Sequence, residues 1–136
     1  MPKPIHAAGL LALLLLSACG PRATGAATED RYAGLEPQIL AWRAALEAAH
    51  PACVEKVDGH GCESFQVTCK AAQEITTDET ARGVTAQLVA AMTFNGRNSD
   101  GSSGKPGSAF ALFSKARDVW TRVEAQPVNM TSCAPL

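Results

Sequence analysis

The first periodic run of hydrophobic residues has the spacing of a helix. Its apolar side chains fall at i, i+4, i+7, i+11 and i+14, namely Leu35, Ile39, Trp42, Leu46 and Ala49. This spacing places them on one face and predicts an amphipathic helix over about residues 36–49, ended by His50-Pro51. The other positions are rich in alanine, which permits close approach to a flat partner such as a sheet.

Two later stretches alternate between apolar and polar residues. From Ser64 to Ile75, five of six odd positions are apolar, and from Val84 to Phe94 every even position is apolar. Alternation with a period of two is typical of a half-buried strand, so each stretch predicts one. Between them, Thr76 and Glu79 have the spacing of a capping box, which predicts a single helical turn.

The last pattern predicts a hairpin, with strands at about 109–115 and 119–124 around Arg117-Asp118. Pairing Ala116 with Val119 divides the side chains between two faces. One face holds Phe110, Leu112, Thr121 and Val123, and the other holds Phe113, Lys115, Trp120, Arg122 and Glu124. Arg-Asp lacks the glycine or asparagine that a tight turn prefers, so a slip by one residue, which would exchange the faces, stays open.

These elements predict an α+β fold, with one N-terminal helix packed on a four-stranded antiparallel meander. The order of elements resembles that of cystatin-like and NTF2-like architectures. The alternative is a disulfide-linked four-helix bundle, because residues 109–123 also fit helical spacing. The threonine and valine content and the regular alternation over 64–75 favour strands.

The N-terminal segment has the features of an export signal. A short basic start precedes an apolar run over residues 7–16, which is too short to span a bilayer. The following Leu16-Ser17-Ala18-Cys19 resembles the lipobox of bacterial lipoproteins at all four positions. This resemblance implies a signal peptide at 1–18, lipidation of Cys19 and anchoring to a membrane. Gly20, in place of the aspartate that retains such proteins at the inner membrane, favours the outer membrane, facing the periplasm.

The remaining chain divides into a tether and one domain. Residues 19–34 are small, polar and punctuated by glycine and proline, as in a flexible linker, and residues 35–136 suffice for one globular domain. The whole chain carries 12 Lys+Arg against 13 Asp+Glu. This balance provides no basic field for nucleic acid, so we expect no nucleic-acid partner.

The cysteines favour two disulfides. Five cysteines are an odd number for an exported chain, and assigning Cys19 to the lipid leaves four that can pair. We expect Cys53–Cys62 with Cys69–Cys133; the alternative is Cys53–Cys69 with Cys62–Cys133. The spacing contains no C-x2-C pair, and we expect neither a metal nor another cofactor.

Candidate catalytic residues are few. Paired cysteines offer no thiolate, His60 lies between two glycines on an expected exposed turn, and His50 is expected to act as a cation at the end of the helix. The stretch 95–107 is rich in glycine and serine but matches neither a phosphate-binding loop nor a calcium loop. It is interpreted as a flexible hairpin loop, with partner contact as the alternative.

The candidate binding patch lies on the last hairpin. If one face of that hairpin is free, Phe113, Lys115, Trp120 and Arg122 form an aromatic and basic surface of the kind that dominates protein interfaces. Alternatively, these residues belong to the core or lie under the tether or the C-terminal tail. We therefore expect a non-enzymatic envelope lipoprotein that binds a protein or glycan.

Two other functions remain open. The first is a small envelope hydrolase that uses His60 or an acidic pair in a cleft between helix and sheet. The second is an inhibitor of an envelope-degrading enzyme, with residues 95–107 as the plug.

Overall fold

The computed structural model describes residues 31–136. The expectations for the signal peptide, for Cys19 and for most of the tether lie outside the described residues. The elements, in chain order, are α2 (Leu35–Ala49), the 3-10 turn η1 (Pro51–Cys53), β1 (Cys62–Ala72), α3 (Thr77–Ala81), β2 (Val84–Arg97), β3 (Ser103–Ala116) and β4 (Val119–Glu124). The strands form one antiparallel sheet in the order β1-β2-β3-β4. The α+β prediction is confirmed, and the helix-bundle alternative is wrong.

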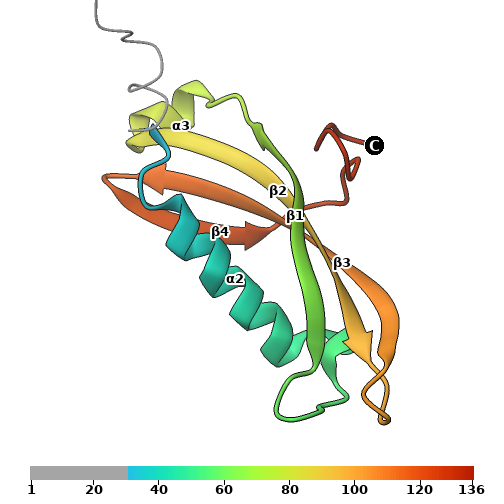
Figure 1. Ribbon diagram of the computed structural model, residues 1–136. Helices are drawn as coiled ribbons and strands as arrows, with labels where there is room; N and C mark the ends of the chain where they lie inside the picture. Colours follow the sequence, from blue (N-terminus) through green and yellow to red (C-terminus); the bar gives the residue numbers. More distant parts are fainter. Residues whose placement is uncertain (1–30) are drawn as a thin grey trace, which may run out of the picture.

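The main core lies between α2 and the inner face of the sheet, across which α2 runs (Figure 1). Leu35, Ile39 and Trp42 of the predicted helical stripe are buried there. The Trp42 ring meets Phe113 of β3 edge to face, with 5.7 Å between the ring centroids. Such pairs stabilise by about 1 kcal/mol beyond the area that they bury.

A second, smaller core lies on the outer face of the sheet. Val89 and Ala91 of β2 are buried there together with Cys133 of the C-terminal tail, residues 125–136. The tail therefore covers part of the face opposite α2. Because both of its faces are covered, β2 is buried at consecutive positions and is not the half-buried strand that its alternation predicted.

Two disulfides cross-link the domain, one at each end of its chain, and both have the predicted pairing. Cys53–Cys62 closes the loop 54–61 between η1 and β1, and Cys69–Cys133 joins the tail to β1. Their Cα atoms are 5.0 and 5.6 Å apart, within the usual range. Each is expected to contribute about 2–4 kcal/mol to stability.

The short helix α3 begins as predicted. The backbone N–H of Glu79 donates to the Thr76 hydroxyl (3.2 Å), and the backbone N–H of Thr76 donates to the Glu79 carboxylate (2.8 Å). Two donors that the helix itself cannot satisfy are thereby paired. Within residues 31–136, no helix is both long and apolar enough to cross a membrane.

The glycine- and serine-rich stretch 95–107 is mostly strand. Phe94 pairs with Gly107 and Asn95 with Pro106, which leaves residues 98–102 as the loop. That loop is held by its own hydrogen bonds, including one from the backbone N–H of Ser102 to Asp100 (2.9 Å). The prediction of a flexible loop over 95–107 is therefore wrong. Within this ladder, the Phe94 ring lies over Gly107, the residue with which Phe94 pairs.

Candidate functional site

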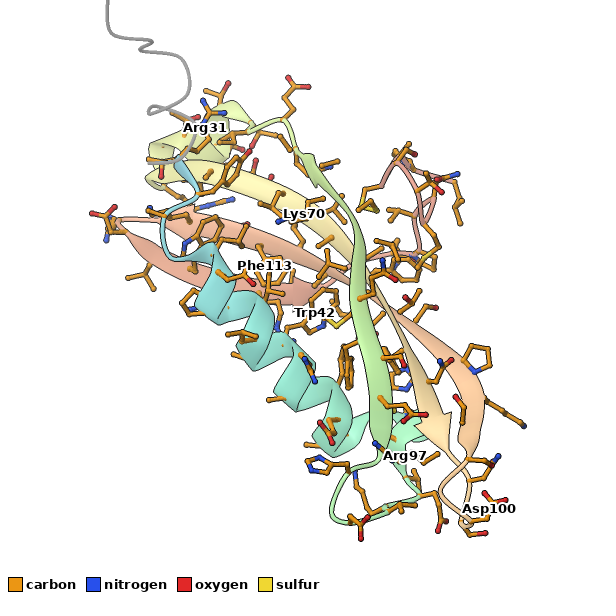
Figure 2. The ribbon with its side chains drawn as sticks, in the orientation of Figure 1. Arg31, Trp42, Lys70, Arg97, Asp100 and Phe113 are labelled. Atoms are coloured by element: carbon orange, nitrogen blue, oxygen red, sulfur yellow. A yellow bond between two sulfur atoms is a disulfide. The ribbon has the colours of Figure 1, made fainter. Side chains whose placement is uncertain are left out.

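The last hairpin has the predicted register but the opposite orientation. Ala116 pairs with Val119 and Phe113 with Arg122, as expected. The face that carries Phe113 is nevertheless the one that α2 covers, as Figure 2 shows for Phe113 and Trp42. Phe113 is 0% exposed and Lys115 only 8%. The expectation that Phe113, Lys115, Trp120 and Arg122 form an exposed patch is wrong, because α2 packs on the face with the larger aromatic side chains.

Lys115 and Trp120 bind the chain just before α2. The Trp120 Nε1–H donates to the Ala33 carbonyl oxygen (2.9 Å), and Lys115 Nζ donates to the same oxygen (3.3 Å). Gly34 follows with φ +84°, and a Cβ there would lie 3.4 Å from the Trp120 indole. We name Ala33, Lys115 and Trp120 the Ala33 clamp. These two members of the predicted patch therefore bind the entry to the domain.

Arg122 borders a groove between α2 and the sheet. The groove has a volume of about 410 Å³ and is lined by the C-terminal half of α2, the middle of β3 and the end of β4. We call it the α2–β3 groove. Its small side chains are Ala45 and Ala49 of α2 and Ala109 of β3, and its charged side chains are Arg122 and Glu124 of β4.

The two charges of the groove are open to solvent. Arg122 and Glu124 are both exposed. Among residues 31–136, neither side chain belongs to a salt bridge or a side-chain hydrogen bond. Both charges can therefore contact polar groups of a ligand. The small alanine side chains leave space for an apolar group of the ligand between α2 and the sheet.

His50 lies at the end of the groove and has a structural role. Its backbone N–H caps α2 through the Leu46 carbonyl (2.8 Å), and its Nδ1 accepts a hydrogen bond from the backbone N–H of Ala52 (3.1 Å). The ring stands edge-on to Phe94, with 4.8 Å between the ring centroids. The side chain of His50 therefore caps the 3-10 turn η1, and its role as a cation at the helix end stays a prediction.

His60 does not line the groove. Its Nδ1 lies 3.0 Å from Glu47 Oε1, and it pairs with Val57 across a tight turn in which Asp58 and Gly59 have positive φ. The sequence therefore placed His60 correctly on an exposed turn. A hydrolase that uses His60 would therefore have its active site outside the α2–β3 groove.

Two carboxylates are held ionised by local hydrogen bonds. The Thr76 backbone N–H, followed by Gln87 and the Thr76 hydroxyl, lowers the pKa of Glu79 below its ordinary 4.5. Hydrogen bonds from the hydroxyl and then the backbone N–H of Ser102 lower the pKa of Asp100. Asp100 lies at the end of the molecule opposite Arg31 and α3 (Figure 2). The two acids are therefore far apart and cannot act as a pair.

Metal-binding residues are not grouped in the part of the chain from 31 to 136, where no cluster of three or more His, Cys, Asp or Glu could hold an ion. Comparison with protein families, with curated proteins and with solved structures finds no match to this chain. The candidate site therefore depends on the geometry of the groove alone.

Sequence reasoning did not find the groove. The signal was present in the alanines at the C-terminal half of the helix and in the small residues Ser108 and Ala109. Where small side chains of a helix face small side chains of a strand, the two backbones either approach closely or leave a gap. Which of these occurs depends on the curvature of the sheet, and the pattern does not report that curvature.

Proposed function

We propose that this chain is a lipid-anchored lipoprotein of the cell envelope whose folded domain binds an envelope protein or glycan through the α2–β3 groove, without catalysis. The lipobox Leu16-Ser17-Ala18-Cys19 supports the anchor, and Gly20 supports an outer-membrane position facing the periplasm. The two disulfides are consistent with an oxidising compartment.

The observation that carries the binding function is the composition of the groove. Apolar side chains line the groove beside polar groups, and its exposed surface is about half polar and half apolar. Arg122 and Glu124 stand at its border without partners among residues 31–136. A concavity that offers apolar packing area together with polar groups that can fix orientation is a usual form of a binding site. Its volume of about 410 Å³ suits a few side chains or sugar rings.

The Ala33 clamp supports a defined orientation at the membrane. It places the entry of the chain at the end of the molecule that carries α3, where Arg31 lies (Figure 2). The segment from Cys19 to Arg31 can span at most about 40 Å when fully extended. The groove is lined by the C-terminal half of α2 and therefore lies toward the end away from this entry.

The anchor is tested by intact-mass measurement of the chain purified from cells that make it. We expect the added mass of acyl groups on a chain that begins at Cys19, and a shift to the aqueous phase on detergent partition for Cys19→Ser. An N-terminus without lipid in the wild-type protein would refute the anchor.

The groove is tested by site-specific photo-cross-linking in the same cells. A benzophenone amino acid at Ala45 is expected to yield a defined adduct. The same group at Leu40, which is 57% exposed on α2 and does not line the groove, is expected to yield none. Equal adducts at both positions, or none at either, would contradict the assignment.

A further inference from the structure

β4 is the more regular of the two edges of the sheet. The edge strands are β1 and β4, because the strands lie in the order β1-β2-β3-β4. β1 has two register shifts in its pairing with β2, and it carries the exposed Lys70. Bulges and lysines protect an edge from pairing with another strand. β4 pairs with β3 from Val119 to Glu124 without a shift, so it is the edge that another strand can join.

The backbone groups that face the open edge follow from the ladder between β3 and β4. The Ala125 N–H donates to the Phe110 carbonyl oxygen (3.0 Å), so the backbone groups of Ala125 face β3. Backbone groups of successive residues in a strand point to opposite sides, so those of Val123 also face β3. The N–H and C=O of Arg122 and Glu124 therefore face the open edge. Within residues 31–136, no turn, loop or side chain hydrogen-bonds to them.

The side chains of β4 divide into a charged face and an apolar face. Arg122 pairs with Phe113, so its side chain and that of Glu124 point to the side of the sheet that α2 covers. Both are exposed, at the border of the α2–β3 groove. Val123 points to the opposite side and is 58% exposed. The strand thus presents two opposite charges on one face and an exposed valine on the other.

A second copy of the chain complements this edge when a two-fold axis passes beside Val123. The two β4 strands are then antiparallel, and Val123 lies opposite Val123 of the other copy. Arg122 of each copy lies opposite Glu124 of the other, and each of these pairs exchanges its free N–H and C=O groups. Opposite charges that face each other across two strands stabilise the pairing. On the other face, the two exposed valines cover each other, so the edge is complementary to itself.

Other registers lose this complementarity. An axis beside Arg122 or Glu124 would set that residue opposite its own copy, and like charges directly opposite each other are destabilising. An axis beside Thr121 would set Glu124 opposite Asp118, and both of these are acidic. An axis between two residues would set the free backbone groups of one copy opposite groups that already bind β3. The order of charges on β4 therefore favours a second copy, in one register, over an unrelated strand.

We propose that two copies of this chain pair through β4 and form one continuous sheet, with four strands from each copy. Side chains opposite each other on paired strands lie on the same side, so both α2 helices cover one face of that sheet. The two α2–β3 grooves therefore open on the same face, next to the shared strands. A guanidinium has five N–H donors, so Arg122 paired with Glu124 keeps donors for a groove ligand. The inference goes beyond the proposed function and does not depend on it.

Charge reversal tests the pairing. Sedimentation equilibrium is measured on the oxidised chain from residue 19, with Cys19→Ser to keep it free of lipid. The shared strands are short, so we expect a reversible wild-type dimer with a dissociation constant in the micromolar range. Arg122→Glu and Glu124→Arg each set like charges opposite each other twice, and each should weaken the dimer at least tenfold. Both side chains are exposed, so circular dichroism should show that both variants fold.

Two combinations of these changes should restore the dimer. An equimolar mixture of Arg122→Glu and Glu124→Arg pairs an acidic edge with a basic one, so heterodimers should form with an affinity within threefold of the wild type. The double variant, which exchanges the two charges, should regain the homodimer. Lys70→Glu is the matched control, because it makes the same change of charge on the other edge. It should leave the affinity within twofold of the wild type.

The register is tested separately by cross-linking. The axis sets Val123 opposite itself at a pair that shares no hydrogen bond, where side chains are closest. Val123→Cys should therefore form an intermolecular disulfide under mild oxidation. Val119→Cys is the control, because Val119 is 61% exposed on the same face of β4 but lies far from Val119 of the other copy in this register. It should form at least tenfold less covalent dimer.

The inference is overturned by a wild-type chain that stays monomeric at millimolar concentration, or by a dimer that both single reversals leave intact. It is also overturned if the mixture of reversed variants stays monomeric, if Lys70→Glu abolishes the dimer, or if Val119→Cys cross-links as fast as Val123→Cys. None of these results bears on the photo-cross-link from Ala45, which tests the groove by itself. Failure of the dimer and failure of the proposed function are thereby distinguished.

Discussion

The indole N–H of Trp120 donates a hydrogen bond to the carbonyl oxygen of Ala33, 2.9 Å away and 87 residues earlier in the chain. This bond joins the last strand to the start of the domain. Trp120→Phe keeps the aromatic ring and removes the donor, and we expect a loss of about 1 kcal/mol in the free energy of unfolding. Chemical denaturation measures it.

The control for this variant lies next to it. Val119 is 61% exposed, and Val119→Ala is expected to change stability by less than about 0.5 kcal/mol. Limited trypsin digestion at Arg31 should also be faster in Trp120→Phe, because the clamp then depends on Lys115 alone. Digestion at the wild-type rate, together with unchanged stability, would show that the bond does not hold the entry.

The β3–β4 turn is expected to respond to better turn residues. Arg117 and Asp118 both have positive φ, +50° and +63°, as a type I′ turn requires. Asparagine and glycine adopt this geometry at lower cost. The double variant Arg117→Asn with Asp118→Gly should therefore be more stable by about 1 kcal/mol in thermal or chemical unfolding. A lower melting temperature would mean that the two side chains contribute contacts that outweigh the backbone strain.

Gly107 is expected to tolerate no side chain. A Cβ at this position would overlap the Phe94 ring, which is buried across the ladder. Gly107→Ala should lower the free energy of unfolding by about 1–3 kcal/mol. A double-mutant cycle with Phe94→Leu isolates the cause, because the smaller side chain should recover part of that loss. Strict additivity of the two changes would place the effect elsewhere.

Acid should weaken the start of α3. The pKa of Glu79 is below its ordinary 4.5, so its ionised form stabilises the fold above about pH 4.5, and that contribution is lost as the pH falls through the lower folded value. Glu79→Gln keeps an acceptor for Thr76 but cannot titrate. The stability difference between wild type and variant should therefore shrink from pH 6 to pH 3. A difference that stays constant over this range would contradict the assignment.

The two disulfides should differ in their contribution to stability. Cys53–Cys62 joins residues 9 apart and Cys69–Cys133 residues 64 apart. The loop-entropy relation predicts about 3 kcal/mol for the first and about 4 kcal/mol for the second. Paired Cys→Ser variants, measured by chemical denaturation, test the order. Equal losses would indicate that the unfolded chain is already compact near the tail.

The sequence was sufficient for the elements and the disulfides because these depend on local patterns. The helix spacing, the Thr76–Glu79 capping box and the cysteine parity each need only neighbouring residues or a count. The pairing of Ala116 with Val119 followed from placing the two-residue turn at Arg117-Asp118. The helix, the capping box, the two disulfide pairs and the hairpin pairing are confirmed in the structure.

The orientation of the hairpin could not be predicted in the same way. Both of its faces carry apolar side chains, and which one is inward depends on what covers each. α2 covers the face of Phe113, and the tail packs near Phe110 on the other. The stretch 95–107 was mistaken for a loop because glycine and proline usually mark turns, whereas here Gly107 lies under an aromatic ring and Pro106 occupies an open edge.

The Ala33 clamp also decides where mechanical load would enter the molecule. Lys115 and Trp120 belong to two different strands, and both bind the backbone before the first turn of α2. A pull on the N-terminal end is therefore transmitted straight into the sheet and does not unwind the helix from its first residue. If the chain hangs from a membrane while a partner is bound at the groove, these two hydrogen bonds put β3 and β4, and not α2 alone, in the path of the force.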